Sequence, residues 1–249
     1  MIPEHKKIYF VSDCHFGIPD YQSSQAREKK FVLWLDDIKK DAHEIYILGD
    51  LFDYWFEYKS VVPRGYTRLL GKLAELSDSG IKIYYFTGNH DMWTFGYLKQ
   101  EIGLEIIYKP VVKEINGLKF MLAHGDGLGP GDFGYKMMKK IFLCKLCRWL
   151  YARLHPNFAA WVARHISNRS RFSHEATDML YRGDDKEYLL VYAKKLLKKE
   201  HFDFFIFGHR HLPLDVKISE NTRYINLGDW LVHFSYAVLD RQKFEIKRF

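Results

Sequence analysis

Residues 45–53 have the sequence IYILGDLFD, in which a short hydrophobic run gives way to a glycine and two aspartates. The run at 45–48 is hydrophobic throughout and rich in aromatic and β-branched residues, which is typical of a strand buried on both faces of a sheet. Asp50 and Asp53 follow it at once. We therefore expect them at the edge of a sheet, where open α/β folds bind their ligands.

The same arrangement recurs four more times along the chain. Hydrophobic runs at residues 8–11, 83–86, 120–123 and 204–207 are each followed closely by polar side chains. These polar segments are DCH at 13–15, GNHD at 88–91, HGD at 124–126 and GHRH at 208–211. Each segment alone is more typical of a turn or of a buried histidine than of a metal ligand. Five occurrences directly after strand-like runs indicate one metal site assembled from several strands.

The side chains of these segments form a mixed nitrogen and oxygen ligand set without a thiolate. The candidate metal ligands are Asp13, His15, Asp50, Asn89, His124, His209 and His211. Such a set suits manganese, iron or zinc, and it argues against both a cysteine-based structural zinc and an all-oxygen calcium site. The sequence therefore predicts two divalent metals close together, an arrangement suited to phosphoryl chemistry.

In this order the segments resemble the calcineurin-like metallophosphoesterases, whose pattern is D-x-H, G-D-x-x-D, G-N-H-[DE], H and G-H-x-H. The resemblance implies a four-layer α/β/β/α sandwich of two mixed sheets. It implies a first metal on Asp13, His15 and His211, a second on Asn89, His124 and His209, and Asp50 bridging the two. It also implies that His90 is a catalytic residue, which stabilises the transition state or protonates the leaving oxygen, and that Asp53 orients it.

Composition favours one α/β domain over residues 1–249, carrying an insertion at about 132–180. The N-terminus runs directly into the first strand-like run, so we expect no signal peptide. The chain has 3 cysteines, which do not suggest a disulfide framework, and a cytoplasmic location is the simplest expectation. Cys144 and Cys147 fall in a helical pattern, where we expect packing thiols.

Positive charge is concentrated in the insertion. The formal net charge is +7, and residues 133–174 hold nine lysines and arginines with no acidic residue. The rest of the chain has 29 basic and 31 acidic residues, a net charge of −2. Apolar residues at three- and four-residue spacings predict an amphipathic helix over 133–154 and a second short helix after Pro156.

Two interpretations of this insertion stay open. Its apolar stripe can pack on the body of the protein while its charges are solvated. Alternatively, it forms a lid that borders an apolar substrate and contacts an anionic membrane surface. Basic residues and Trp149 or Trp161 also suit single-stranded nucleic acid, but the aliphatic content favours lipid, and we expect no nucleic-acid partner.

The GDLFDYW segment, the HGD segment and the helical insertion resemble a narrower family, the UDP-2,3-diacylglucosamine pyrophosphohydrolases of lipid A synthesis. That resemblance implies Mn²⁺-dependent cleavage of UDP-2,3-diacylglucosamine to UMP and 2,3-diacylglucosamine 1-phosphate (lipid X). It implies a protein peripheral to the cytoplasmic face of the inner membrane, with a lid over an acyl-chain chamber. The substrate contacts it implies are Asn89, His90, Asp132, Tyr135, Asn168, Arg169 and Arg171.

His90 departs from the narrower family, whose best-known members have arginine after the asparagine of the third motif. Arginine would stabilise phosphate charge, whereas histidine can also donate a proton. The alternative is therefore a divergent metallophosphoesterase (a phosphodiesterase, phosphatase or nuclease) acting on another phosphoester.

Overall fold

The computed structural model describes residues 2–131, 133–165, 167 and 180–249. Its strands form two mixed sheets, one of six strands in the order β11-β10-β1-β2-β3-β4 and one of five in the order β5-β6-β7-β9-β8. The first sheet contains β1 (Lys7–Val11), β2 (Ala42–Leu48), β3 (Lys82–Phe86), β4 (Glu105–Ile107), β10 (Ser235–Asp240) and β11 (Lys243–Arg248). The second contains β5 (Val111–Ile115), β6 (Leu118–Ala123), β7 (Phe204–Phe207), β8 (Pro213–Ser219) and β9 (Thr222–Leu227).

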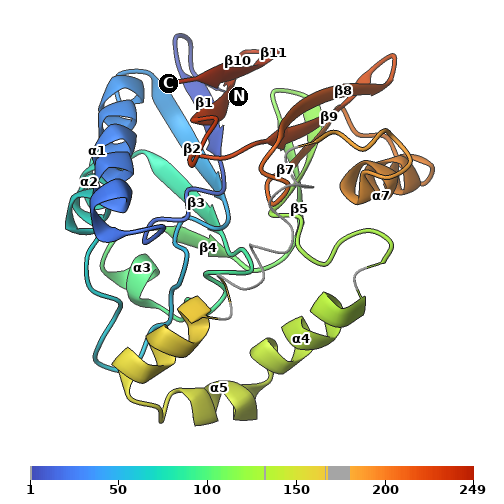
Figure 1. Cartoon of the computed structure of the whole chain (residues 1–249). Coiled ribbons are helices and arrows are strands. Elements are labelled where there is room, and N and C mark those ends of the chain that lie inside the picture. Colours follow the sequence, from blue (N-terminus) through green and yellow to red (C-terminus); the bar gives the residue numbers. More distant parts are fainter. Residues whose placement is uncertain (1, 132, 166, 168–179) are drawn as a thin grey trace.

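Helices cover the outer faces of both sheets (Figure 1). The first sheet is covered by α1 (Tyr21–Ile38) and α2 (Thr67–Asp78), and α3 (Tyr97–Gln100) precedes β4. The second sheet is covered by α7 (Tyr188–Leu197). In α1, Phe31, Trp34, Leu35 and Ile38 repeat at helical spacing and are all buried, so this face of the helix packs on the sheet.

Alternate side chains of the central strands enter different hydrophobic layers, because successive residues of a strand point to opposite faces. Tyr9 and Val11 of β1 belong to the layer beneath α1 and α2. Ile8 and Phe10 belong to the layer between the two sheets, where the ring centroids of Phe10 and Phe120 are 6.5 Å apart. A third layer lies between the second sheet and α7. The predicted four-layer α/β/β/α sandwich is confirmed.

The five predicted hydrophobic runs are β1, β2, β3, β6 and β7. In the first sheet, β1, β2 and β3 are parallel neighbours, with Val11 opposite Ile47 and Leu48 opposite Phe86. In the second sheet, β6 and β7 are parallel, with Ala123 opposite Phe207. The carboxyl ends of these strands therefore meet at one end of the sandwich, and each is followed by one of the polar motifs.

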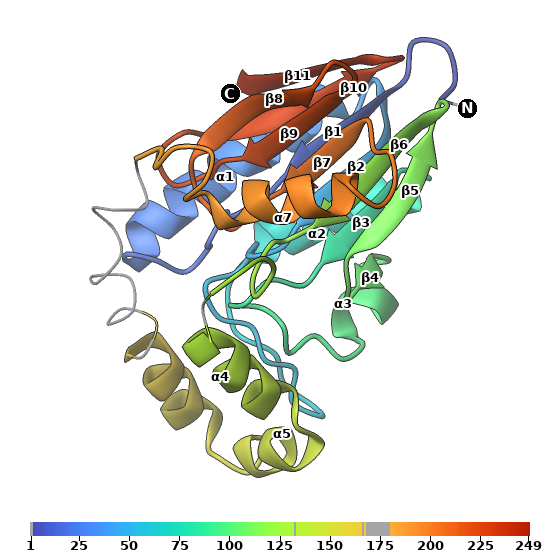
Figure 2. The ribbon, with the colours of Figure 1, turned by 90° about the vertical axis from the view of Figure 1, so that its right-hand side faces the viewer.

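The insertion forms helices that lie together at one end of the molecule (Figures 1 and 2). They are α4 (Phe133–Leu143), α5 (Lys145–Tyr151) and a third helix over residues 156–165. The single helix predicted over 133–154 is wrong in one respect, because the backbone at Cys144 is extended and separates α4 from α5. The predicted second helix is present, but it begins at Pro156 itself and not after it, because proline favours the first position of a helix.

The insertion helices leave much of their apolar surface uncovered. Neither α4 nor α5 has a buried residue, and Phe133, Leu146 and Trp149 are 82%, 63% and 54% exposed. Cys144 is exposed and Cys147 is partly exposed, so the expectation that both thiols pack inside is wrong for Cys144. Within the described ranges, no helix combines the length and apolar composition needed to cross a bilayer.

Candidate metal centre and active site

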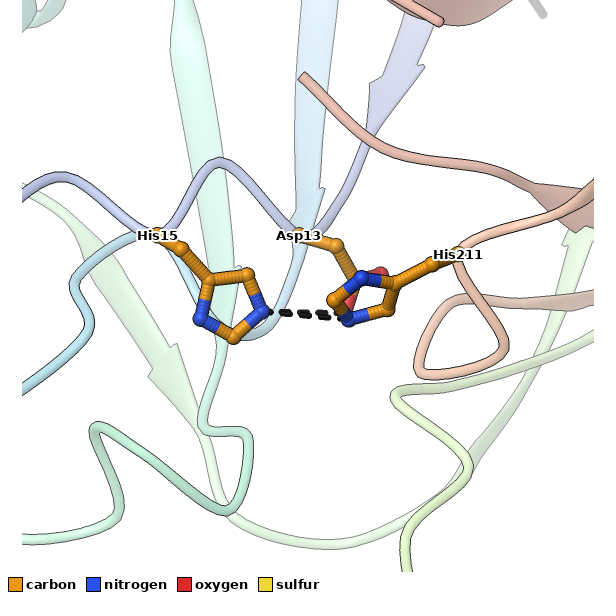
Figure 3. Close-up of side chains that lie close together, drawn as sticks. All are labelled: Asp13, His15 and His211. Carbon is orange, nitrogen blue, oxygen red and sulfur yellow. Dashed lines mark hydrogen bonds and ion pairs between the residues drawn. The ribbon is translucent and has the colours of Figure 1, made fainter. Parts of the chain in front are cut away.

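Asp13, His15 and His211 form the first cluster of candidate ligands, as Figure 3 shows. Asp13 and His15 follow β1 in the first sheet, while His211 follows β7 in the second. The Nε2 atoms of His15 and His211 are 3.2 Å apart. Asp13 Oδ1 lies 3.3 Å from Nε2 of His211 and 3.8 Å from Nε2 of His15. Three ligand atoms from two segments far apart in the sequence thus converge on one small volume.

Asp50, His124 and His209 form the second cluster. Asp50 Oδ2 lies 3.3 Å from His124 Nε2, and Asn89 Oδ1 lies 3.1 Å from the same nitrogen. The ring centroids of His124 and His209 are 5.0 Å apart. Here too the ligands come from both sheets, because Asp50 and Asn89 follow β2 and β3 while the two histidines follow β6 and β7.

Asp50 also connects the two clusters. Its Oδ2 atom lies 3.6 Å from Nε2 of His15, which belongs to the first cluster. One carboxylate oxygen therefore faces an imidazole nitrogen of each cluster. This is the position that a bridging ligand needs.

The atoms that face one another in these clusters fit divalent cations better than they fit hydrogen bonding. Asp13 Oδ1 and Asp50 Oδ2 are buried, and neither accepts a hydrogen bond from any residue that the structure describes. Buried carboxylate oxygens without a donor are costly. A cation between these oxygens and the neighbouring imidazole nitrogens would satisfy them, and the mixed nitrogen and oxygen set suits manganese, iron or zinc.

Hydrogen bonds from neighbouring groups orient several of the ligands. His124 Nδ1 lies 2.8 Å from the carbonyl oxygen of Leu48. Since a carbonyl only accepts, Nδ1 carries a proton, and Nε2 faces the cluster as the atom that would bind a metal once it is deprotonated. Asp13 Oδ2 accepts from the backbone N–H of His209 at 2.8 Å and from the hydroxyl of Ser12, leaving Oδ1 for the site.

The backbone at most of the ligands is left-handed. The φ angle is 55° at Asp13, 44° at His15, 51° at Asp50, 66° at His209 and 55° at His211. Non-glycine residues rarely adopt this conformation, and where they do the strain is often associated with function. The tight turns that follow the strands therefore direct these side chains back over the sheet edge.

Two motif glycines are required because other ligands approach them closely. A Cβ atom at Gly88 would overlap the carboxylate of Asp50 and lie 2.6 Å from its backbone nitrogen. A Cβ atom at Gly208 would overlap the hydroxyl of Ser12 and lie 2.5 Å from Oδ2 of Asp13. Each glycine thus lets one loop pack against the carboxylate ligand of another.

Burial and neighbouring charges shift the pKa values of the clustered side chains strongly. Burial lowers the pKa of both His15 and His124, but the neighbouring carboxylates raise it more, to about 9 and about 10. Burial alone would raise the pKa of Asp50, whereas His124 holds it well below its usual range. At His209 burial and the charge of His124 outweigh the raising effect of Asp126, Asp50 and Asp13, and lower its pKa to about 4.

His90 and Asp53 lie beside the first cluster. Asp53 Oδ1 is 3.4 Å from His15 Nδ1 and 3.6 Å from His90 Nδ1, and the two imidazole centroids are 4.8 Å apart. His90 Nδ1 also lies 3.0 Å from the backbone carbonyl oxygen of Asp53. That nitrogen must donate to the carbonyl, so Nε2 is the atom left to exchange a proton with a substrate.

Asp91 has a structural role at the site that sequence reasoning did not assign, although it closes the GNHD motif. It is fully buried, and its carboxylate accepts from the backbone N–H groups of Leu51 at 2.8 Å and Gly88 at 2.7 Å and from the hydroxyl of Tyr85. Burial and the nearby Asp50 raise the pKa of Asp91 to about 6. Asp91 thus fixes the second and third motif loops relative to each other.

A largely apolar cavity of about 320 Å³ opens beside His90. The body of the protein contributes Asp53, Tyr54, Asn89, His90 and Trp93, and the insertion contributes Tyr135, Met138, Ile141, Phe142, Cys147, Arg148, Tyr151, Val162, Ala163 and Ser167. Of the predicted substrate contacts, Asn89, His90 and Tyr135 line this cavity, and the hydroxyl of Tyr135 also donates to Asp126. Asp132, Asn168, Arg169 and Arg171 lie outside the described residues.

Comparison with known proteins agrees with this geometry. The family model described as calcineurin-like phosphoesterase matches residues 6–213. A curated protein named UDP-2,3-diacylglucosamine hydrolase, from Porphyromonas gingivalis (strain ATCC BAA-308 / W83), is 42% identical over 246 residues, covering 94% of this chain and 94% of that protein. A protein of the same name from Shewanella sp. (strain W3-18-1) is 28% identical over 241 residues, covering 97% and 96%. The chain therefore belongs to the calcineurin-like phosphoesterases.

Proposed function

We propose that the protein hydrolyses the pyrophosphate bond of UDP-2,3-diacylglucosamine, releasing UMP and 2,3-diacylglucosamine 1-phosphate (lipid X) in lipid A biosynthesis. The observation that carries this proposal is the apolar cavity that begins at Asn89 and His90, next to both ligand clusters. A phosphoryl group at the clusters would leave acyl chains free to enter that cavity. The 42% identical relative, which is named UDP-2,3-diacylglucosamine hydrolase, supports this substrate.

The ligands that we propose for the metals are those of the two clusters. Asp13, His15 and His211 would hold one cation, Asn89, His124 and His209 the other, and Asp50 both. Divalent metals in such a pair polarise a phosphoryl group and provide a hydroxide nucleophile near neutral pH. Mn²⁺ is our first choice, and Fe or Zn suits the same donor atoms.

The residues beside the clusters would act on the phosphoryl oxygens and on the leaving group. Asn89 can donate from its amide while its oxygen faces His124. His90 can donate from Nε2 to the oxygen that leaves with the sugar phosphate, since its Nδ1 is held by Asp53. Asp53 acts as a positioning residue, because its carboxylate lies between His15 and His90.

The insertion helices would serve as a lid and as the contact with the membrane. Their exposed aromatic and aliphatic side chains occur together with lysines and arginines, a combination that binds anionic lipid surfaces. A substrate that carries acyl chains resides in a bilayer, so we place the protein peripherally on the cytoplasmic face of the inner membrane. Asp132, Tyr135, Asn168, Arg169 and Arg171 remain predicted substrate contacts of this lid.

A second candidate function is favoured by His90. Histidine at this position is common to phosphoesterases with other substrates, so a divergent phosphodiesterase, phosphatase or nuclease is the alternative. Such an enzyme would cleave bis-p-nitrophenyl phosphate or single-stranded DNA efficiently, and it would not need the apolar cavity.

The deciding experiment incubates purified protein with UDP-2,3-diacylglucosamine and Mn²⁺ in detergent, and measures UMP and lipid X by mass spectrometry. We expect both products, and none from an Asp50→Ala variant, which lacks the shared carboxylate. Parallel reactions with Fe²⁺ and Zn²⁺ identify the preferred metal. Absence of UMP, with turnover of simple diesters, would favour the second function instead.

A further inference from the structure

The 156–165 helix separates two cavities of different character. Val162 and Ala163 line the apolar cavity beside His90. Trp161 and Arg164, on the same helix, line a second cavity of about 670 Å³ between the helix and the loop at residues 54–64. Tyr54 lines both, so the two cavities share a wall, and there the hydroxyl oxygens of Tyr151 and Tyr54 are 3.2 Å apart.

The second cavity is basic and aromatic. Its basic lining residues are Arg64, His155, Arg164 and His165, and no carboxylate is among the described residues that line it. Its aromatic lining residues are Tyr54, Tyr58 and Trp161. By contrast, the cavity beside His90 is lined mainly by apolar side chains, and Arg148 is the one arginine among its described lining residues.

The two arginines of the second cavity are available to a ligand. Both are exposed, and neither forms an ion pair with a carboxylate in the described part of the chain. A guanidinium group offers five N–H donors in a planar arrangement, which suits phosphate and carbonyl oxygens. Aromatic side chains next to such donors suit the flat ring of a nucleobase.

The inner end of this cavity abuts the loops that carry the catalytic groups. Tyr54 directly follows Asp53 in the chain. Arg164 lies near enough to Tyr66 to affect it electrostatically, although burial dominates and raises the pKa of Tyr66 to about 12. The hydroxyl of Tyr66 in turn donates to the carbonyl oxygen of Phe16, next to His15, at 3.1 Å. A ligand in the cavity could therefore extend from the metal centre outward.

We propose that this second cavity binds the uridine nucleotide half of the substrate, while the apolar cavity takes the acylated half. The inference rests on the proposed function, and it identifies the residues that recognise the nucleotide. A molecule with a nucleotide on one side of its pyrophosphate and acyl chains on the other needs two compartments that meet at the reacting phosphorus. Arg64 and Arg164 donate to the uracil oxygens, and Tyr58 or Trp161 contacts the base, while the phosphate lies at the metal centre.

The test compares UMP binding to the full-length protein and to an R64A/R164A variant by isothermal titration calorimetry. We expect UMP affinity to fall at least about tenfold in the variant, since hydrogen bonds from charged groups contribute that much or more. The matched control is R68A/R248A, which removes the same charge from exposed positions outside both cavities. That control should bind UMP as the unmodified protein does.

Inorganic phosphate, titrated in parallel, distinguishes nucleotide binding in this cavity from a general attraction of anions to positive charge. Phosphate affinity should change less than twofold in R64A/R164A, and W161A should weaken UMP but not phosphate. Unchanged UMP affinity, or equal losses for UMP and phosphate, would overturn the proposal. These binding measurements need no turnover. They can therefore contradict the nucleotide site while the hydrolysis assay supports the proposed function, or support the site while that assay contradicts the function.

Discussion

Glu187 and Arg210 form a buried, bidentate ion pair beside His209 and His211, two of the candidate metal ligands. Arg210 Nε lies 3.0 Å from Glu187 Oε2, and Arg210 Nη2 lies 3.1 Å from Glu187 Oε1. Glu187 is 1% exposed and Arg210 is 4% exposed. Because Arg210 stands between His209 and His211, the pair fixes the loop that supplies one ligand to each cluster. The loop is thereby tied to the start of α7, where the chain returns from the insertion.

Breaking this pair should weaken metal binding. Glu187→Gln keeps the shape of the side chain but removes the charge, so we expect metal affinity to fall about 10- to 100-fold, as for other residues that orient ligands. Metal titration of the purified variant measures this. The control is Asp215→Asn, which breaks an exposed pair with Arg223 and should cost about 1 kcal/mol of stability or less. Unaltered metal affinity in Glu187→Gln would contradict the positioning role.

Gly88→Ala should disable the metal centre without unfolding the protein. The added Cβ atom would overlap the carboxylate of Asp50, so the bridging oxygen must move, and a displacement of about 1 Å commonly costs about 100-fold in rate. Turnover and metal content are both measured. Gly71→Ala is the matched control, because a Cβ atom there meets nothing within 4 Å and a helical alanine is favoured by about 0.5–1 kcal/mol. Equal activity of the two variants would refute the steric argument.

The strands and their motifs could be predicted from the sequence because both are encoded locally. The runs at β1, β2, β3, β6 and β7 are nearly continuous in hydrophobicity, and the polar motifs begin within two residues of their ends. The left-handed backbone at the ligands could not be predicted, since aspartate and histidine only rarely adopt it. It depends on loops from two sheets that meet only in the folded protein.

The tertiary partners of residues and the exposure of the insertion helices could not be predicted from the sequence either. Glu187 and Arg210 are 23 residues apart, and no local pattern identifies them as partners. The helix break at Cys144 could not be predicted, because no proline or glycine lies nearby in the sequence. Helical periodicity there correctly indicated an apolar stripe, but it could not show that the stripe stays exposed.

Metal affinity should increase with pH. In the metal-free protein the pKa values of His15 and His124 are raised to about 9 and about 10, so both imidazoles are protonated at pH 7. Metal ligands must be neutral imidazoles, and a cation has to displace these protons. Calorimetry with Mn²⁺ at pH 7, in two buffers of different ionisation enthalpy, should therefore detect proton release. Binding without proton release would contradict the raised pKa values.

The same pKa values predict how the stability of the metal-free protein changes with pH. Because they are raised above the unfolded value of about 6.5, the imidazole–carboxylate pairs stabilise the fold fully below that pH. This contribution should decline as pH rises from about 6.5 and disappear above about 9 to 10. Thermal melts of metal-free protein at pH 6.5 and pH 10 measure the loss, and added Mn²⁺ should reduce it.

Leu146→Glu should reduce binding to anionic membranes. Leu146 is 63% exposed on α5 among lysines and arginines, and burying it in the interface should contribute about 1.5–3 kcal/mol. Sedimentation with phosphatidylglycerol vesicles measures binding. Leu33→Glu is the matched control, because Leu33 is 61% exposed on α1 and not on the insertion. Equal binding of both variants would contradict membrane contact through the insertion.

The variants His90→Ala and His90→Arg should differ, and the difference identifies what His90 contributes. General acid catalysis is typically worth about 10²–10⁴-fold, so His90→Ala should lose activity in that range. Arginine stays charged at every accessible pH but cannot give up a proton. If His90 mainly protonates the leaving oxygen, His90→Arg fails as badly as His90→Ala. Since Asp53 holds Nδ1 and leaves Nε2 to act on the substrate, we expect that failure, with metal content retained. Activity of His90→Arg within tenfold of the unmodified enzyme would instead assign His90 a purely electrostatic role, the one that arginine has in the narrower family.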